Sequence, residues 1–223
     1  MVEEYMMLRV GEPFGLIEGY KYLGLWHSDE EAEARSFGRL PGLPQYADLS
    51  GPDGVPDGMV DAYDKTTIGN GYPDFTWGFT NMVMFKGFEL SFLIMGSHGN
   101  DLFNTQRIRR EWQGFGAEST DPKVMDYWTP DNQDTDVVAL YDGAWFESQN
   151  LENKYELTSM ALSYFVEDAS FVRLKTITLA YNFEASLLKK IGFSRARVYA
   201  SGTNLLTLTD YTGYDPEVAQ FPN

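Results

Sequence analysis

The most constraining feature of this sequence is a pair of alternating segments on either side of Lys86-Gly87. Apolar residues occupy every second position, with Asn81 as an interruption, and a period of two is typical of a β-strand. One face carries Phe75, Trp77, Phe79, Val83 and Phe85 before the turn, and Phe88, Leu90, Phe92 and Ile94 after it. The pattern predicts a β-hairpin. Each arm has about the 9–11 residues that a tilted membrane-spanning strand needs.

A second alternating region lies near the end of the sequence. Residues 171–183 and 195–208 predict another antiparallel pair, joined by a connection that contains one helical turn. Phe171 is predicted on the aromatic face of the first of these strands, together with Arg173 and Lys175. Two earlier strands are predicted at residues 5–10 and 15–26, which makes six strands and an all-β protein.

The connections between the six predicted strands alternate in length. The long ones are residues 27–74 and 97–168, which hold 24 of the 33 acidic residues, and the others are short. In an up-and-down sheet, alternate connections lie at the same end, so the long loops gather at one end. That asymmetry is typical of antiparallel transmembrane β-barrels of the outer membrane. Since the smallest such barrels have about eight strands, we expect this chain to be part of a larger barrel.

Composition excludes several classes of function. Cysteine is absent, which excludes disulfides and thiolate metal sites. A formal net charge of -16 argues against binding to nucleic acid and against adsorption to anionic lipid. No apolar run approaches the roughly 18 residues of a transmembrane helix. Residues 1–5 lack the basic and apolar regions of a signal peptide.

Seven segments in order resemble one family, the SusC/RagA family of TonB-dependent outer-membrane transporters. Any one of them is weak evidence, but their shared order is specific, and they extend over nearly the whole chain. The similar segments are residues 11–26 (GEPFGLIEGYKYLGLW), 57–69 (DGMVDAYDKTTIG), 72–79 (YPDFTWGF), 96–104 (GSHGNDLFN), 168–175 (DASFVRLK), 197–205 (RVYASGTNL) and 211–218 (YTGYDPEV).

This resemblance implies an outer-membrane protein of a Gram-negative bacterium that imports glycans, peptides or other large nutrients. It implies a barrel of about 22 strands, with this chain as a partial C-terminal barrel region over residues 1–223. The plug domain, the TonB-interacting segment and the final strand are expected to be absent from it. Implied partners are a SusD-like surface lipoprotein, TonB through the missing N-terminal region, and outer-membrane lipid. No catalytic site is expected.

An aspartate-rich loop is the best candidate for metal binding. The acidic residues Asp53, Asp57, Asp61 and Asp64, with Gly58, take positions 1, 5, 9, 12 and 6 of an EF-hand-like frame, which favours calcium. The match is partial, since Val55 stands at position 3 and an Asp at position 12. Asp48 could contribute instead if residues 52–56 loop out. A metal-free polar loop is the alternative.

Aromatic residues of the long loop are candidates for contacts with a substrate or a partner. Trp112, Tyr127, Trp128 and Trp145 could stack on sugar rings or anchor a protein interface. Packing of the loop on itself is the competing explanation, because a loop of this length needs internal support.

Two other functions remain open at this point. A soluble β-rich module could bind carbohydrate through the loop aromatics, with an optional calcium loop, and the Phe75 face would then be its core. A hydrolase that uses paired carboxylates is remote, since the acidic residues lie in solvated runs. The two histidines, His27 and His98, lie far apart in the sequence and are predicted at strand ends, without a catalytic role.

Overall fold

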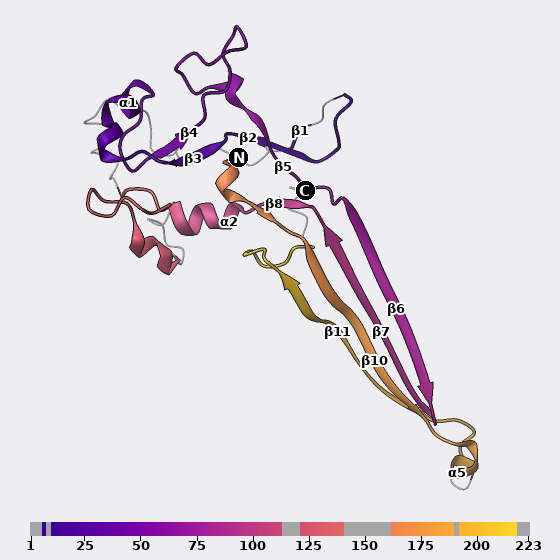
Figure 1. Cartoon of the computed structure of the whole chain (residues 1–223). Coiled ribbons are helices and arrows are strands. Elements are labelled where there is room, and N and C mark those ends of the chain that lie inside the picture. The colour runs from indigo at the N-terminus through magenta and orange to yellow at the C-terminus, as the bar shows by residue number, and fades with distance from the viewer. Residues whose placement is uncertain (1–5, 8–9, 113–120, 141–161, 190–191, 218–223) are drawn as a thin grey trace. The chain divides into compact units, whose positions relative to one another are not determined.

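The computed structural model describes residues 6–7, 10–112, 121–140, 162–189 and 192–217, which fall into two compact units (Figure 1). Unit 1 comprises Met1–Tyr72, Leu102–Glu167 and Ala219–Asn223, and unit 2 comprises Pro73–Asp101 and Asp168–Val218.

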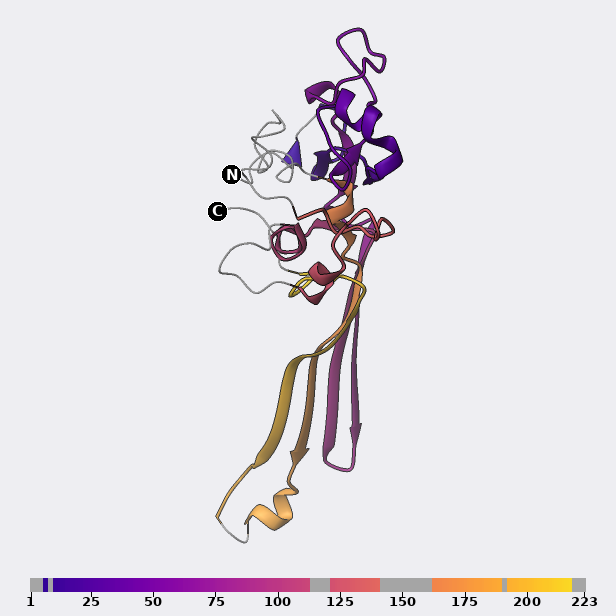
Figure 2. The same ribbon diagram turned by 90° about the vertical axis from the view of Figure 1, so that its left-hand side faces the viewer.

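Unit 2 is built around four long strands. They are β6 (Phe75–Phe85), β7 (Phe88–His98), β10 (Phe171–Asn182) and β11 (Arg197–Thr209). Their order in the sheet is β11-β10-β7-β6, and every neighbouring pair is antiparallel, as the two views show (Figures 1 and 2). Each long strand therefore lies beside the next long strand of the chain, which confirms an up-and-down arrangement for these four.

The short connections of unit 2 lie at one end of the sheet. Lys86 and Gly87 have φ of 47° and 86°, which is the positive-φ pair of a two-residue hairpin turn. Helix α5 (Ala185–Lys189) follows β10, and Gly192 comes after it with φ of 82°. The long connection from β7 to β10 starts at the opposite end. The sorting of loops predicted from the sequence thus holds for these four strands.

Unit 1 consists of short strands and single helical turns. Strands β1 (Met6–Met7), β2 (Leu16–Gly19) and β5 (Thr66–Asn70) form one small sheet, and β3 (Tyr22–Leu25) pairs with β4 (Pro44–Tyr46). Strands β8 (Asp101–Phe103) and β9 (Val166–Asp168) pair where the chain passes between the units. The helices are η1 (Ser28–Glu30), α1 (Glu31–Ser36), η2 (Ala62–Asp64), α2 (Thr105–Arg107), the π-helical η3 (Ile108–Trp112), η4 (Pro122–Asp126) and η5 (Ser163–Phe165).

The prediction of one long strand at residues 15–26 is wrong. The segment breaks after Gly19, and its two halves pair with β5 and β4, which both lie in the predicted loop 27–74. All four residues of β2 are buried, so this strand is covered on both faces. A wall strand of a membrane barrel has one face toward lipid. The six-strand meander is therefore reduced to four strands.

An aromatic core holds unit 1 together. Trp112, Trp128, Phe165, Tyr20 and Tyr46 are among its buried members, which come from the two longest sequence stretches of the unit. Burial of such rings is the main source of stability for a unit with little regular secondary structure. None of the helices in the described part of the chain is long and apolar enough to cross a membrane.

Candidate functional site: a two-faced sheet

The register of unit 2 sorts the side chains of its four strands onto two faces, because paired residues share a face and successive residues alternate. The apolar face carries Phe75, Trp77, Phe79, Val83, Phe85, Phe88, Leu90, Phe92, Ile94, Val172, Leu174, Ile177, Leu179, Tyr181, Val198, Ala200, Leu206 and Leu208, with Asn81 and His98 as its polar members. The polar face carries Thr76, Thr80, Glu89, Ser91, Ser97, Arg173, Thr176, Thr178, Asn182, Arg197, Ser201, Thr203, Thr207 and Thr209, with Met82, Met84, Leu93, Met95, Phe171, Ala180 and Tyr199 among them.

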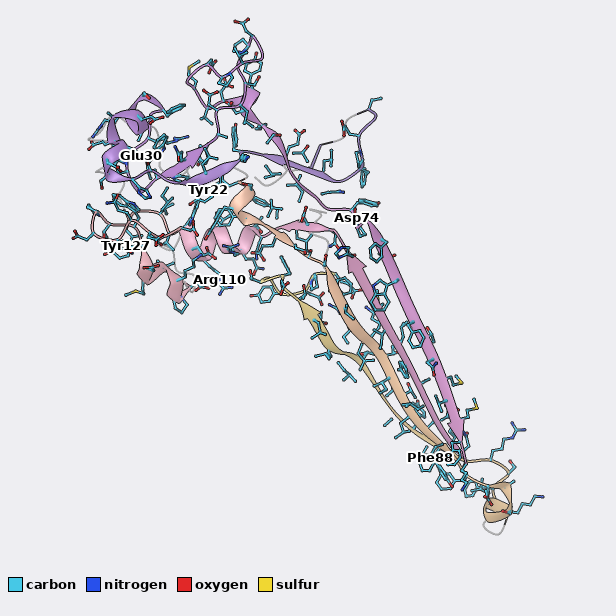
Figure 3. All side chains as sticks on the ribbon, viewed as in Figure 1. Tyr22, Glu30, Asp74, Phe88, Arg110 and Tyr127 are labelled. Carbon is cyan, nitrogen blue, oxygen red and sulfur yellow. The ribbon has the colours of Figure 1, made fainter. Side chains whose placement is uncertain are left out.

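Aromatic rings gather at the two ends of the apolar face. At the end marked by Asp74 in Figure 3, the rings of Phe75 and His98 lie 5.3 Å apart between centroids. At the end marked by Phe88, the ring of that residue lies 4.7 Å from the ring of Tyr181. Aliphatic side chains lie between the two ends, together with the rings of Phe79 and Phe92, whose centroids are 6.0 Å apart. Two aromatic girdles around an apolar band are typical of strands that cross an outer membrane.

A β-bulge at Lys175 changes the faces predicted for the start of β10. Leu174 pairs with Ile94 and Thr176 pairs with Leu93, so β10 holds one residue more than β7 at this point. The extra residue places Phe171 and Arg173 on the polar face. Their prediction on the aromatic face, with Ile177, is wrong, because strict alternation does not survive a bulge.

Two groups of ion pairs lie on the polar face. Arg173 is only 2% exposed, and its guanidinium donates to Glu217 and, at 2.6 Å, to Asp215. The ammonium of Lys175 lies 2.8 Å from the carboxylate of Glu217. The hydrogen bond from Arg173 lowers the pKa of Asp215 below its ordinary value. Sequence reasoning missed this group, because its members are about forty residues apart.

The second ion pair joins neighbouring strands nearer the short turns. Arg197 of β11 donates to Glu89 of β7 at 2.8 Å. The polar face therefore pairs its arginines with carboxylates at both ends. Between them, in the described residues, it presents mainly hydroxyl and thioether side chains.

The aspartate loop is held by its own carboxylates. The Asp64 side chain is fully buried and accepts backbone N–H bonds from Leu49 at 2.6 Å, Ser50 at 3.1 Å and Asp61 at 2.8 Å. The Asp48 carboxylate accepts from Asp57 and Gly58, and Asp61 accepts from Tyr63. It is Asp48 rather than the exposed Asp53 that faces the glycine turn.

The described residues contain no group of three or more carboxylate or imidazole side chains placed to hold a metal ion. The oxygens of Asp64 are already used by three N–H donors, so this arrangement gives the calcium site no support. Calcium binding by Asp53, Asp57, Asp61 and Asp64 stays a prediction.

Two of the four candidate contact aromatics lie in the core of unit 1. Trp112 is 1% exposed and Trp128 is 3% exposed. The indole of Trp112 stacks on Tyr164, with centroids 5.6 Å apart, and donates to the carbonyl of Asp136. These rings offer no face to a ligand in this packing, which favours packing of the loop on itself. Tyr127 is half-buried, and Trp145 lies outside the described residues.

A charged network surrounds this aromatic core. Arg107 donates to Glu111 at 2.6 Å and to Glu167 at 2.8 Å. Burial alone would lower the pKa of Arg107, but the bonds to the two carboxylates raise it. Lys123 donates to the hydroxyl of Tyr164 at 2.6 Å. The spacing of four residues between Arg107 and Glu111 is the one sequence signal that predicts part of this network.

A polar cavity of about 320 Å³ lies elsewhere in unit 1. Its lining includes His27, Glu30, Gln133 and Asp136. Gln133 accepts from the backbone N–H of Ser28, and Asp136 accepts from the hydroxyl of Tyr22. His27 and His98 belong to different units, and neither has a catalytic arrangement around it in the described residues.

No family model matches the chain. The chain is 34% identical over 217 residues to TonB-dependent receptor P26 of Formosa agariphila, covering 96% of this chain and 20% of that receptor. It is 26% identical over 166 residues to TonB-dependent receptor SusC of Bacteroides thetaiotaomicron, covering 73% of this chain and 14% of that receptor. The chain thus spans about a fifth of the length of the first of these curated relatives.

The chain is also similar in fold to solved structures of a transporter. The chain matches the structure of the RagAB peptide transporter with a TM-score of 0.70 and 26% identity, over 97% of this chain and 22% of that chain. The same importer in its "closed-closed" state matches with a TM-score of 0.69.

Proposed function

This chain is homologous to SusC/RagA-type TonB-dependent receptors over about 20% of their length and is a portion of such a protein, and we propose that unit 2 forms part of a transporter wall. Such receptors are outer-membrane proteins of Gram-negative bacteria and are transporters, not enzymes. The proposed role is the passage of a nutrient, without covalent chemistry by this chain.

The sorting of side chains in unit 2 carries this proposal. One face is apolar apart from Asn81 and His98 and has aromatic rings at both ends, and both faces are exposed along β6 and β11. The other face carries hydroxyls and paired charges. Lipid suits the first face and a hydrated pore suits the second. A soluble carbohydrate-binding module would instead leave the apolar face in water, where an exposed apolar patch of this size favours aggregation.

The edges of the sheet require further strands. Strands β6 and β11 each have one neighbour, so the outer edge of each leaves N–H and C=O groups without ladder partners among the described residues. Such groups are costly in lipid. We propose that other strands of the receptor continue from both edges and close a barrel of about 22 strands.

The nutrient and the partners are proposed from the relatives. RagAB is described as a peptide transporter, and SusC as a TonB-dependent receptor. We propose that this receptor imports a peptide, a glycan or another large nutrient, together with a SusD-like surface lipoprotein. TonB would supply the energy through a part of the receptor outside this chain.

A pair of neighbouring substitutions in the full receptor tests the lipid-facing assignment. Ile177→Arg places a charge on the apolar face near the middle of β10, and we expect outer-membrane insertion to fall sharply. An arginine side chain that faces lipid at the bilayer midplane destabilises a membrane β-barrel by about 2–4 kcal/mol. Thr178→Arg, one residue away on the polar face, is the matched control and should insert normally. Insertion is measured from the amount of receptor in purified outer membranes.

Two outcomes of this experiment would contradict the proposal. If Thr178→Arg blocks insertion and Ile177→Arg does not, the two faces have been assigned the wrong way round. If neither substitution matters, the sheet does not lie in the membrane.

A further inference from the structure

The segment after β11 folds back onto the polar face of the sheet. We call residues 210–217 the strap (Figure 1). Near its start, Thr209 donates to the carbonyl of Ser170 and accepts from the backbone N–H of Tyr211. At its end, the carboxylates of Asp215 and Glu217 bind Arg173 and Lys175. The strap has no regular secondary structure, and these polar contacts hold it in place together with the buried side chains of Tyr211 and Pro216.

The two sides of this contact differ in kind. Arg173 belongs to a central strand and its side chain is only 3% exposed, whereas the side chains of Asp215 and Glu217 are 37% and 29% exposed. The cation is therefore fixed in the sheet, and the carboxylates come from the more exposed partner. In addition, the buried Nε of Arg173 has no acceptor among the described residues. The guanidinium has more donor capacity than the strap uses.

The chemistry of arginine limits what can happen to the strap. The guanidinium group of arginine keeps its charge at every physiological pH. Departure of the strap would remove both carboxylates from Arg173, and a second anion that takes their place would offset that loss. A carboxylate matches the planar donors of arginine through two parallel hydrogen bonds.

We infer that Arg173 and Lys175 form a carboxylate-binding site on the polar face, which Asp215 and Glu217 occupy as internal ligands until a carboxylate-bearing ligand displaces them. The ligand class is an acidic peptide, a peptide C-terminus or an acidic sugar. The inference rests on the proposed function for one point only, that the polar face lines the transport path.

The other arginine of the polar face provides a control. Arg197 is paired within the sheet, with Glu89 of the neighbouring strand, and has no contact with the strap in the described residues. A carboxylate ligand that acted on arginines in general would affect both. A ligand that binds specifically at this site would affect only Arg173 and the strap.

Hydrogen exchange in the full-length receptor, purified in detergent, tests the inference. The signal is the exchange of the Tyr211 and Glu217 amides, which donate inside or beside the strap. The probe is tri-glutamate with a free C-terminus, and its control is tri-glutamine amide, which has the same length without carboxylates. We expect millimolar tri-glutamate to speed exchange of the strap by at least about tenfold, because open states are exchange-competent. Tri-glutamine amide should have no effect.

Variants separate the site from its surroundings. The double variant D215N/E217Q should show fast strap exchange without any probe, and Arg197→Gln should behave as the wild type. The inference is overturned if tri-glutamate leaves strap exchange unchanged in the wild type, if both probes act equally, or if D215N/E217Q stays protected. A receptor that inserts and imports its nutrient, yet shows any of these results, refutes the carboxylate site and leaves the proposed function standing.

Discussion

The burial and the hydrogen bonding of single residues in this protein depend on contacts that their sequence neighbours do not predict. Asp64 illustrates this, since it is an acidic residue in an acidic loop and yet is fully buried. Its two oxygens accept three backbone N–H groups from two separate parts of the loop. A buried carboxylate that satisfies several donors stabilises the backbone around it. Its role in the described structure is to fix the loop.

Replacement of Asp64 tests this role and the calcium prediction together. We expect Asp64→Ala to destabilise unit 1 by roughly 3 kcal/mol, because three buried donors lose their acceptor. Asp53→Ala, at an exposed position, should be nearly neutral. Unfolding is followed in calcium and in EDTA. If calcium stabilises the wild type and Asp53→Ala abolishes that effect, the loop is a metal site after all.

At the scale of elements, the bulge in β10 is the feature with the largest consequence. One extra residue, Lys175, decides which face receives the first half of the strand. With the bulge, Arg173 lies on the polar face beside the strap. If the same residues, Lys175 included, alternated strictly, Arg173 would lie on the apolar face with Ile177. Bulges re-aim side chains in this way without breaking the sheet.

Deletion of Lys175 should therefore be tolerated, whereas a deletion in the regular part of the strand should not. Without Lys175, Leu174 and Thr176 become neighbours that keep their partners Ile94 and Leu93, so Arg173 stays on the polar face and we expect insertion near the wild-type amount. Deletion of Thr178 shifts one part of β10 by one residue and exchanges the faces of its side chains, and we expect the receptor to be lost from the outer membrane. Immunoblots of purified outer membranes give the comparison. Loss of the Lys175 deletion variant, or normal insertion of the Thr178 deletion variant, would contradict the assignment of the bulge.

At the scale of the whole molecule, the two units differ in how their apolar side chains are covered. Unit 1 buries an aromatic core from both of its main sequence stretches, as a water-soluble domain does. Unit 2 is a sheet with an apolar face, a polar face and two edges. In the proposed transporter wall, lipid would cover the apolar face and further strands the edges, because an uncovered edge and an uncovered apolar face favour association.

This difference predicts how residues 1–223 behave when they are expressed alone. In detergent-free buffer we expect the chain to associate through unit 2, and we expect detergent to disperse it. Sedimentation velocity with and without detergent measures the change. A stable monomer in water, with β6 and β7 intact, would contradict the membrane assignment and favour the soluble module.

The sequence by itself determined the features that depend on neighbouring residues. Alternation placed β6, β7 and β11 and most of β10, and Lys86-Gly87 and Gly192 marked the turns at one end of the sheet. Seven ordered motifs indicated the family that the relatives support. These signals are local, because side-chain period and turn geometry are properties of short segments.

Only the tertiary structure decided the features that depend on residues far apart in the chain. It divided residues 15–26 between two small sheets, buried Trp112 and Trp128, and placed the strap on Arg173. Alternation could not locate the bulge at Lys175, since a bulge is defined by the partner strand. Burial and long-range pairing emerge from packing of the whole chain, and a period read along one segment carries no information about them.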